Sequence, residues 1–172
     1  QSPSRLNSIW RLSMSTAGDH AELLYFQKLA IEAPATVDLD IDADDSDVII
    51  RDMAGNVRAT TGSGLCDVTS GGSVDLKASS GVIVGTAGVK ATVRGGSGSV
   101  KVVAGSVIDV TSGAGDVQAD TAQGGVVTTE GGQIDLRLTS PNFGATTATG
   151  TDGEVVVRIP KGAKYNLDAF ST

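Results

Sequence analysis

A run of aspartates at residues 37–47 is the part of the sequence best suited to chemistry. If the run forms a strand, alternate aspartates share one face, because side chains alternate sides along a strand. These aspartates are Asp38, Asp40, Asp42 and Asp44. Carboxylate oxygens are the ligands that Ca²⁺ prefers, but the run lacks the glycine and the distal glutamate of an EF-hand loop. It predicts either a calcium site or a solvated acidic face, of which the second is favoured.

Few other side chains suit catalysis. His20, the only histidine, lies in a predicted turn, and a single histidine excludes histidine-based triads and most zinc sites. Cys66 occupies a repeat position that other units fill with Ile or Val, so we expect a buried small hydrophobe. Glycan-cleaving β-helices use surface carboxylates, but they gather them with aromatic platforms in one groove. The outward acids here stand without aromatic neighbours in the sequence, at Asp67, Asp75, Asp109 and Asp135.

The composition limits the class of protein. At 172 residues the chain is long enough for one domain with a buried core. Its net charge of -7 argues against a nucleic-acid or anionic-membrane partner, since both recruit Lys and Arg. No stretch approaches the ~18 apolar residues of a transmembrane span. The first residue is Gln1 and not Met, as removal of an export leader would leave it, which favours a secreted protein.

Glycines form the clearest pattern in the chain. A fixed spacing of seventeen residues separates Gly64, Gly81, Gly98, Gly115 and Gly132. A period of this kind is typical of a solenoid, in which one short unit stacks on the next. Glycine also supplies the positive backbone angles of tight corners. We therefore expect a block of short coils from about Val48 to Gly132.

Each unit holds two short strands whose alternate positions are small or aliphatic. The inward pairs of one strand are Cys66 and Val68, Ile83 and Gly85, Val100 and Val102, Val117 and Ala119, and Ile134 and Leu136. Those of the other are Val57 and Ala59, Val74 and Leu76, Ala91 and Val93, Ile108 and Val110, and Gly125 and Val127. Period two is the half-buried β pattern. The predicted fold is all-β, a right-handed parallel β-solenoid (β-helix or β-roll) with seventeen-residue coils. An antiparallel meander would explain the alternation but not the common register.

The chain divides by composition into an N-terminal arm or cap, residues 1–34, and a solenoid domain with capping C-terminal strands, residues 35–172. Residues 1–34 alternate apolar and polar side chains. They predict either a hairpin that caps its own chain or an extended arm that adds a strand to a neighbouring subunit. Large side chains collect outside the repeats, where they could cover the exposed ends of the stack. These candidate capping or assembly residues are Trp10, Leu12, Leu23, Tyr25, Phe26, Phe143, Tyr165 and Phe170.

Three segments carry a resemblance to a known family. Residues 96–102 read Gly-Ser-Gly-Ser-Val-Lys-Val, residues 113–119 read Gly-Ala-Gly-Asp-Val-Gln-Ala, and residues 155–163 read Val-Val-Val-Arg-Ile-Pro-Lys-Gly-Ala. Together they resemble the bacterial adhesin-type family of β-strand repeat proteins, a domain of unknown function. The likeness spans residues 31–170. It implies a right-handed parallel β-helix on an exported or membrane-anchored bacterial protein, and it transfers no catalytic residue.

We therefore expect a non-catalytic scaffold, secreted or on the surface of a bacterium, with an adhesin-like role. Its partner would be a cell-surface glycan or protein, or further copies of itself. Two alternatives stay open. One is a self-assembling structural subunit that forms filaments by end-to-end stacking or by exchange of the N-terminal strand. The other is a polysaccharide-cleaving β-helix enzyme, which the first step of an active-site search disfavours. No cofactor is expected, apart from Ca²⁺ at the acidic run.

Overall fold

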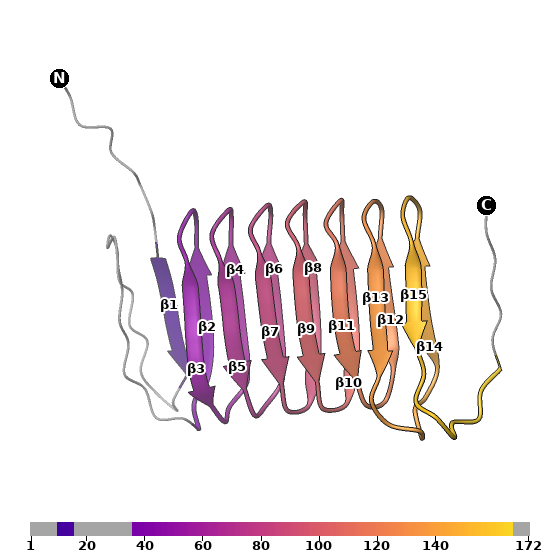
Figure 1. Ribbon diagram of the computed structural model, residues 1–172. Helices are drawn as coiled ribbons and strands as arrows, with labels where there is room; N and C mark the ends of the chain where they lie inside the picture. The colour runs from indigo at the N-terminus through magenta and orange to yellow at the C-terminus, as the bar shows by residue number, and fades with distance from the viewer. Residues whose placement is uncertain (1–9, 16–35, 167–172) are drawn as a thin grey trace.

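The computed structural model describes residues 10–15 and 36–166, and the strands of these segments form two facing sheets. Sheet A has eight strands in the order β1-β2-β4-β6-β8-β10-β12-β14, and sheet B has seven in the order β3-β5-β7-β9-β11-β13-β15. The chain alternates between the two sheets, so each coil contributes one strand to each. Figure 1 shows the coils in a single row. The chain is a parallel β-solenoid, as predicted.

The strands are four to six residues long. Sheet A consists of β1 (Trp10–Ser15), β2 (Asp38–Ala43), β4 (Val57–Thr61), β6 (Val74–Ala78), β8 (Lys90–Gly95), β10 (Val107–Ser112), β12 (Gly125–Thr129) and β14 (Thr146–Gly150). Sheet B consists of β3 (Val48–Met53), β5 (Cys66–Ser70), β7 (Ile83–Ala87), β9 (Val100–Ala104), β11 (Val117–Thr121), β13 (Ile134–Leu138) and β15 (Val155–Arg158). No helix that could span a membrane occurs among the described residues.

Successive coils pair in parallel and in the predicted register. Val57 lies opposite Val74, and Cys66 lies opposite Ile83, so each step is seventeen residues along the chain. The coils extend beyond the predicted block at both ends, from β2 to β15. The first step is eighteen residues, from Leu39 to Val57, and the last is twenty-one, from Gly125 to Thr146. An insertion between β13 and β14 therefore lengthens the last coil without breaking either sheet.

The glycine period has a steric cause at the corners. A Cβ added at Gly81 would collide with the carbonyl oxygen of Gly64, and one at Gly98 would collide with that of Gly81. The same clash recurs between Gly115 and Gly98. Each corner backbone thus lies directly against the corner of the preceding coil. A side chain there would force the coils apart and break the strand pairing on both sides of the corner.

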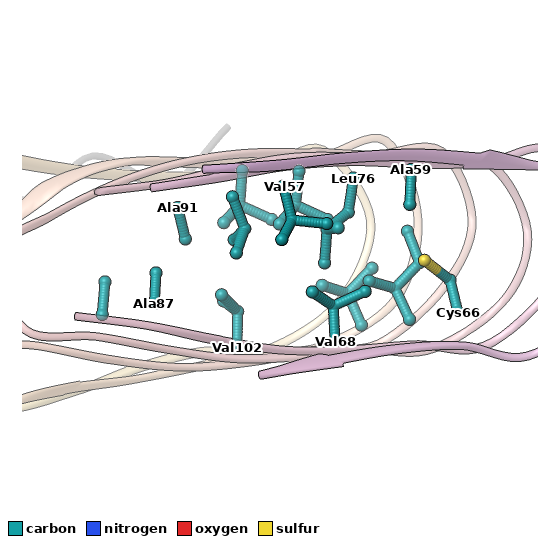
Figure 2. Packing of buried hydrophobic residues seen from close by; sticks show 14 of the residues in the cluster. Val57, Ala59, Cys66, Val68, Leu76, Ala87, Ala91 and Val102 are labelled. Atoms are coloured by element: carbon teal, nitrogen blue, oxygen red, sulfur yellow. The ribbon is translucent and has the colours of Figure 1, made fainter. Parts of the chain in front are cut away.

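The core is the narrow space between the two sheets. All of the predicted inward positions are buried except Gly125, which is partly exposed. Figure 2 shows Val57, Leu76 and Ala91 pointing from one sheet toward Val68 and Val102 of the other. Among the residues that the structure describes, no aromatic side chain belongs to the core, in keeping with the distance that two facing aliphatic layers span.

A third inward position in several strands carries a hydroxyl, which the sequence pattern did not reveal. Thr121 donates to the carbonyl oxygen of Ser106 at 2.6 Å. Thr129 donates to that of Gly131 at 2.7 Å. Such positions adjoin the corners, where backbone carbonyls turn away from the ladders and need donors. The buried hydroxyl residues of this kind are Thr61, Ser70, Ser112, Thr121 and Thr129.

The pairing of Leu76 with Gly85 across the core can be tested by a double-mutant cycle. A Cβ at Gly85 would lie 2.8 Å from Cδ1 of Leu76, so Gly85→Val should destabilise the fold by about 1–3 kcal/mol through overpacking. Leu76→Ala should cost about 2–5 kcal/mol through the cavity it leaves. In the double variant the new valine occupies that cavity. The loss in unfolding free energy, measured by urea denaturation, should therefore be smaller than the sum of the two single losses by about 1 kcal/mol or more.

A matched change on the outer face of the same strand, Thr86→Val, should leave the unfolding midpoint almost unchanged, since Thr86 is exposed. If the losses from Gly85→Val and Leu76→Ala simply add, the two residues do not share one space and this account of the core is wrong.

Candidate functional site

The outer face of sheet A carries a shallow hollow of about 400 Å³ over the first four coils. Its polar lining comes from β2, β4, β6 and β8 and from the corners before them, and the coils place these side chains in columns. Asp40, Arg58, Asp75 and Thr92 follow one another in paired positions. Asp38, Asn56, Ser73 and Lys90 complete the polar lining. We call these eight residues the sheet A hollow.

Hydrogen bonds between coils fix one edge of the sheet A hollow. Oδ1 of Asp38 accepts a hydrogen bond from the backbone N–H of Asn56 at 2.7 Å. Oδ1 of Asn56 in turn accepts one from the N–H of Ser73 at 3.0 Å. Each side chain therefore satisfies a backbone donor of the next coil. These two contacts orient the side chains of Asp38 and Asn56 along the ladder.

The structure places the predicted acidic run on a strand and the turn that follows it. Asp38, Asp40 and Asp42 alternate outward along β2, and Asp44 is exposed in the turn. Within the described part of the chain, no group of three or more His, Cys, Asp or Glu side chains is arranged to hold a metal ion. The alternation is as predicted, whereas calcium binding stays a prediction.

In the part of the chain that the structure describes, four arginine–aspartate ion pairs join neighbouring coils on the outer faces. They are Arg51 with Asp67, Arg94 with Asp75, Arg137 with Asp120, and Arg158 with Asp135. Three of the four outward carboxylates considered for catalysis, at positions 67, 75 and 135, are thus in ion pairs. An arginine partner donates to the oxygens of a carboxylate, which suits a structural role better than acid catalysis.

The Arg51–Asp67 pair is the one whose electrostatics stand out. A hydrogen bond donated by the Arg51 guanidinium holds the pKa of the Asp67 carboxyl below its ordinary value, and the positive charge of Arg51 adds to the effect. The partial burial of Asp67 opposes the shift but does not overcome it. The pair joins β3 of the first coil to β5 of the second, next to the edge of sheet B.

Cys66 lies inside the core at the start of β5, fully buried as predicted. Burial raises the pKa of its thiol to about 12, and the neighbouring Asp67 charge adds to the shift. A thiol with this pKa carries almost no thiolate at neutral pH, and the thiolate is the reactive form. Cys66 is therefore a packing residue and not a nucleophile.

The predicted capping residues separate into three groups. Trp10 and Leu12 belong to β1, which pairs antiparallel with β2 at the edge of sheet A. Phe143 is half-buried in the loop between β13 and β14, and Tyr165 is exposed after β15. The remaining ones, together with the histidine considered for chemistry, lie outside the described residues: His20, Leu23, Tyr25, Phe26 and Phe170.

Several exposed side chains on the outer face of sheet B are apolar. Ile49 is 60% exposed, Val82 43% and Val103 39%. Half-buried Leu65 and Val84 lie on the same face, and we call these five residues the sheet B patch. Strand pairing places Asp67 between Ile49 and Val84, and Lys101 next to Val84, so charged side chains interrupt the sheet B patch.

No protein-family model, curated protein or solved structure matches this chain. The parallel β-solenoid is therefore assigned from the strand pairing and the repeat alone. The family resemblance noted in the sequence stays a hypothesis about relationship.

The pH dependence of stability should report the Arg51–Asp67 pair. Because the pKa of Asp67 is lowered in the folded state, its contribution is present above the ordinary value of 3.8 and is lost as the pH falls through the lowered value. At neutral pH, Asp67→Asn should lower the melting temperature by no more than about 4 °C, since the pair is partly solvated. The difference from wild type should shrink as the pH falls below 3.8 and close once the pH is below the lowered pKa of Asp67.

Asp109→Asn on sheet A is the matched control, because it removes one outward carboxylate from the middle of the solenoid. A difference for Asp67→Asn that does not shrink at all as the pH falls below 3.8 would show that the loss is steric and not electrostatic.

Proposed function

We propose that this chain is a non-catalytic scaffold, secreted or on a bacterial cell surface, with an adhesin-like role in which the sheet A hollow binds a glycan. The observation that carries the proposal is the convergence of charged and amide side chains from four successive coils on that hollow. The bacterial origin and the surface location rest on the family resemblance of the repeat.

Sugar hydroxyls both donate and accept hydrogen bonds, so a glycan site needs acceptors and donors in alternation. The hollow provides an acceptor at Asp40 and donors at Arg58 and Lys90, with Asn56 able to do both, whereas Asp75 is already paired with Arg94. These groups stand at the spacing of adjacent strands, about 4.8 Å.

A rigid scaffold favours such binding even where each contact is weak. Side chains fixed by the strand ladder lose little conformational freedom when a ligand binds, so less of the contact energy is lost to ordering. The hollow is also open and shallow, which suits a chain of sugars that continues past the site more than a small molecule that must be enclosed.

Two other functions stay as alternatives. A self-assembling subunit is supported by the two terminal coils. Their edge strands have one neighbour each, and at the C-terminal coil the core side chains Val155 and Val157 are exposed. A glycan-cleaving enzyme would use the same outer face. It differs in its outcome, because an enzyme releases new reducing ends from a glycan that an adhesin only binds.

A glycan array probed with the full chain, followed by titration of any bound glycan, tests the proposal. We expect binding without new reducing ends, and a loss of about 10-fold or more in affinity for Arg58→Ala or Lys90→Ala, since each removes a charge-assisted hydrogen bond. Lys101→Ala is the matched control for Lys90→Ala, because Lys101 is exposed on β9 of the opposite sheet.

Binding that Lys101→Ala weakens as much as Lys90→Ala would contradict a site on sheet A. An array without any bound glycan would also contradict the proposal. The alternative would then be a protein partner that binds through the sheet B patch, and Val82→Lys should abolish that binding.

A further inference from the structure

The C-terminal coil leaves the core open. Val155 and Val157 of β15 stand opposite Ile134 and Leu136 of β13, so they continue the two inward columns of sheet B. Ile134 and Leu136 are fully buried, whereas Val155 is 39% exposed and Val157 37%. In sheet A, Ala148 of β14 is only partly buried against the core. Among the described strands, β14 and β15 have one neighbour each, as β1 and β3 have at the other end.

The N-terminal coil is different. All of its inward side chains on β2 and β3 are 8% exposed or less. β1 pairs antiparallel along the whole of β2, so the edge of sheet A is covered at this end. Residues 37–55 also carry seven acidic side chains against one arginine, whereas residues 146–166 carry three basic side chains against two acidic ones. The solenoid thus has an acidic end, at which the core side chains are buried and β1 covers sheet A while β3 is an edge strand, and a nearly neutral end, at which core side chains are exposed.

One open end favours a closed pair over a filament. Head-to-tail stacking would require the open end of one copy to displace the covering of the next. Contact between two open ends uses the same surface twice, and such an isologous contact closes on itself. The two N-terminal ends would then point away from each other, which keeps their acidic side chains apart.

The sequence of β15 and the residue before it suits this contact. Residues 154–158 read Glu-Val-Val-Val-Arg, with opposite charges at equal distances from Val156. If two copies of β15 pair antiparallel about Val156, Val155 of each lies opposite Val157 of the other on the core side. On the outer side, Glu154 of each lies opposite Arg158 of the other. Opposite charges in directly facing positions stabilise an antiparallel pair, and like charges destabilise it.

The same two-fold axis accommodates sheet A. An axis normal to the two facing sheets would also bring β14 against its copy, with Ala148 at the centre on the core side. Thr147 and Thr149 would face each other across the outer side, a favourable cross-strand pair. Both sheets would then continue from one copy into the other, and the core would be closed.

We propose that two copies of this chain form a dimer through their C-terminal coils, with β15 pairing antiparallel to its copy about Val156 and Glu154 of each facing Arg158 of the other. The inference goes beyond glycan binding and does not rest on it. Two short strand pairs form a small interface, so the dissociation constant of the dimer should lie in the micromolar range.

Sedimentation velocity of the full chain, from about 1 µM to about 500 µM, measures the association directly. We expect a shift from the monomer mass to twice that mass. Val157→Lys should keep the chain monomeric throughout. Val126→Lys is its matched control, because Val126 is 45% exposed on the outer face of β12, and it should dimerise like wild type.

A charge-reversal experiment tests the register. In Glu154→Lys two pairs of positive charges would face each other across the axis, and in Arg158→Glu two pairs of negative charges would do so. Each variant alone should dimerise at least 10-fold more weakly than wild type. An equal mixture should recover the dimer, because the heterodimer pairs Lys with Glu on one side and Arg with Glu on the other. Thermal melts establish that each variant is folded before mixing.

Four results would overturn the proposal. They are a wild-type chain that stays monomeric at the highest concentration, a wild-type chain that forms filaments, charge variants that dimerise like wild type, and a mixture that does not recover the dimer. A dimer that forms only when residues 167–172 are removed would also overturn it for the full chain, since that segment would then be the occupant of the open end. Glycan binding by Val157→Lys is measured separately, so either proposal can fail alone.

Discussion

The hydrogen-bonded ladder between successive coils is the constraint on which the rest of the structure depends. A parallel ladder with one strand per coil in each sheet stacks every residue on its counterpart seventeen positions away. Whatever one coil places inward must therefore pack against the same kind of side chain above and below. The corners obey the same rule more strictly, because a Cβ on Gly98 would meet the backbone of Gly81. The glycine and aliphatic columns are two consequences of one spacing.

The ladder also decides what the charged residues can do. Outward side chains of adjacent coils stand side by side, so an aspartate and an arginine in paired positions can form an ion pair, as Asp120 and Arg137 do. Exposed pairs of this kind are worth about 0–1 kcal/mol each, far less than the burial of one core leucine. They do not hold the coils together. Their effect is to occupy carboxylates that would otherwise be available for catalysis, and to leave recognition to columns such as that of Asp40 and Arg58.

The repeat made most of the fold predictable from the sequence. Period two within strands and period seventeen between them identified the inward positions of the five central units, with Gly125 the one position not fully buried. The terminal coils were harder, because the first step is eighteen residues and the last is twenty-one. The insertion before β14 hides the period but not the alternation, so Ala148 had no counterpart at the expected distance. Within β12, the same alternation continued from Val127 predicts that Thr129 points inward, and Thr129 is one of the buried hydroxyl residues.

The candidate sites were less predictable, since they depend on relations that spacing alone does not express. Arg51 meets Asp67 over sixteen residues and Arg158 meets Asp135 over twenty-three, so no single offset finds both pairs. The sheet A hollow arises where side chains of unequal length stand in neighbouring columns. The long residue Arg58 lies between the shorter Asp40 and Asp75. This difference in side-chain length across the surface cannot be located in the sequence until the coils are stacked.

The two ends of the stack follow from the same ladder. Inside the solenoid each coil covers the next, so the stability of a coil does not depend on where in the row it lies. At an end this equivalence fails, and one face of the core and two strand edges need another partner. The chain treats its ends unequally: β1 lies along β2 at one of them, whereas Val155 and Val157 remain exposed at the other. A scaffold built by repetition can thus be uniform along its length and still direct association, because only its ends distinguish one coil from the next.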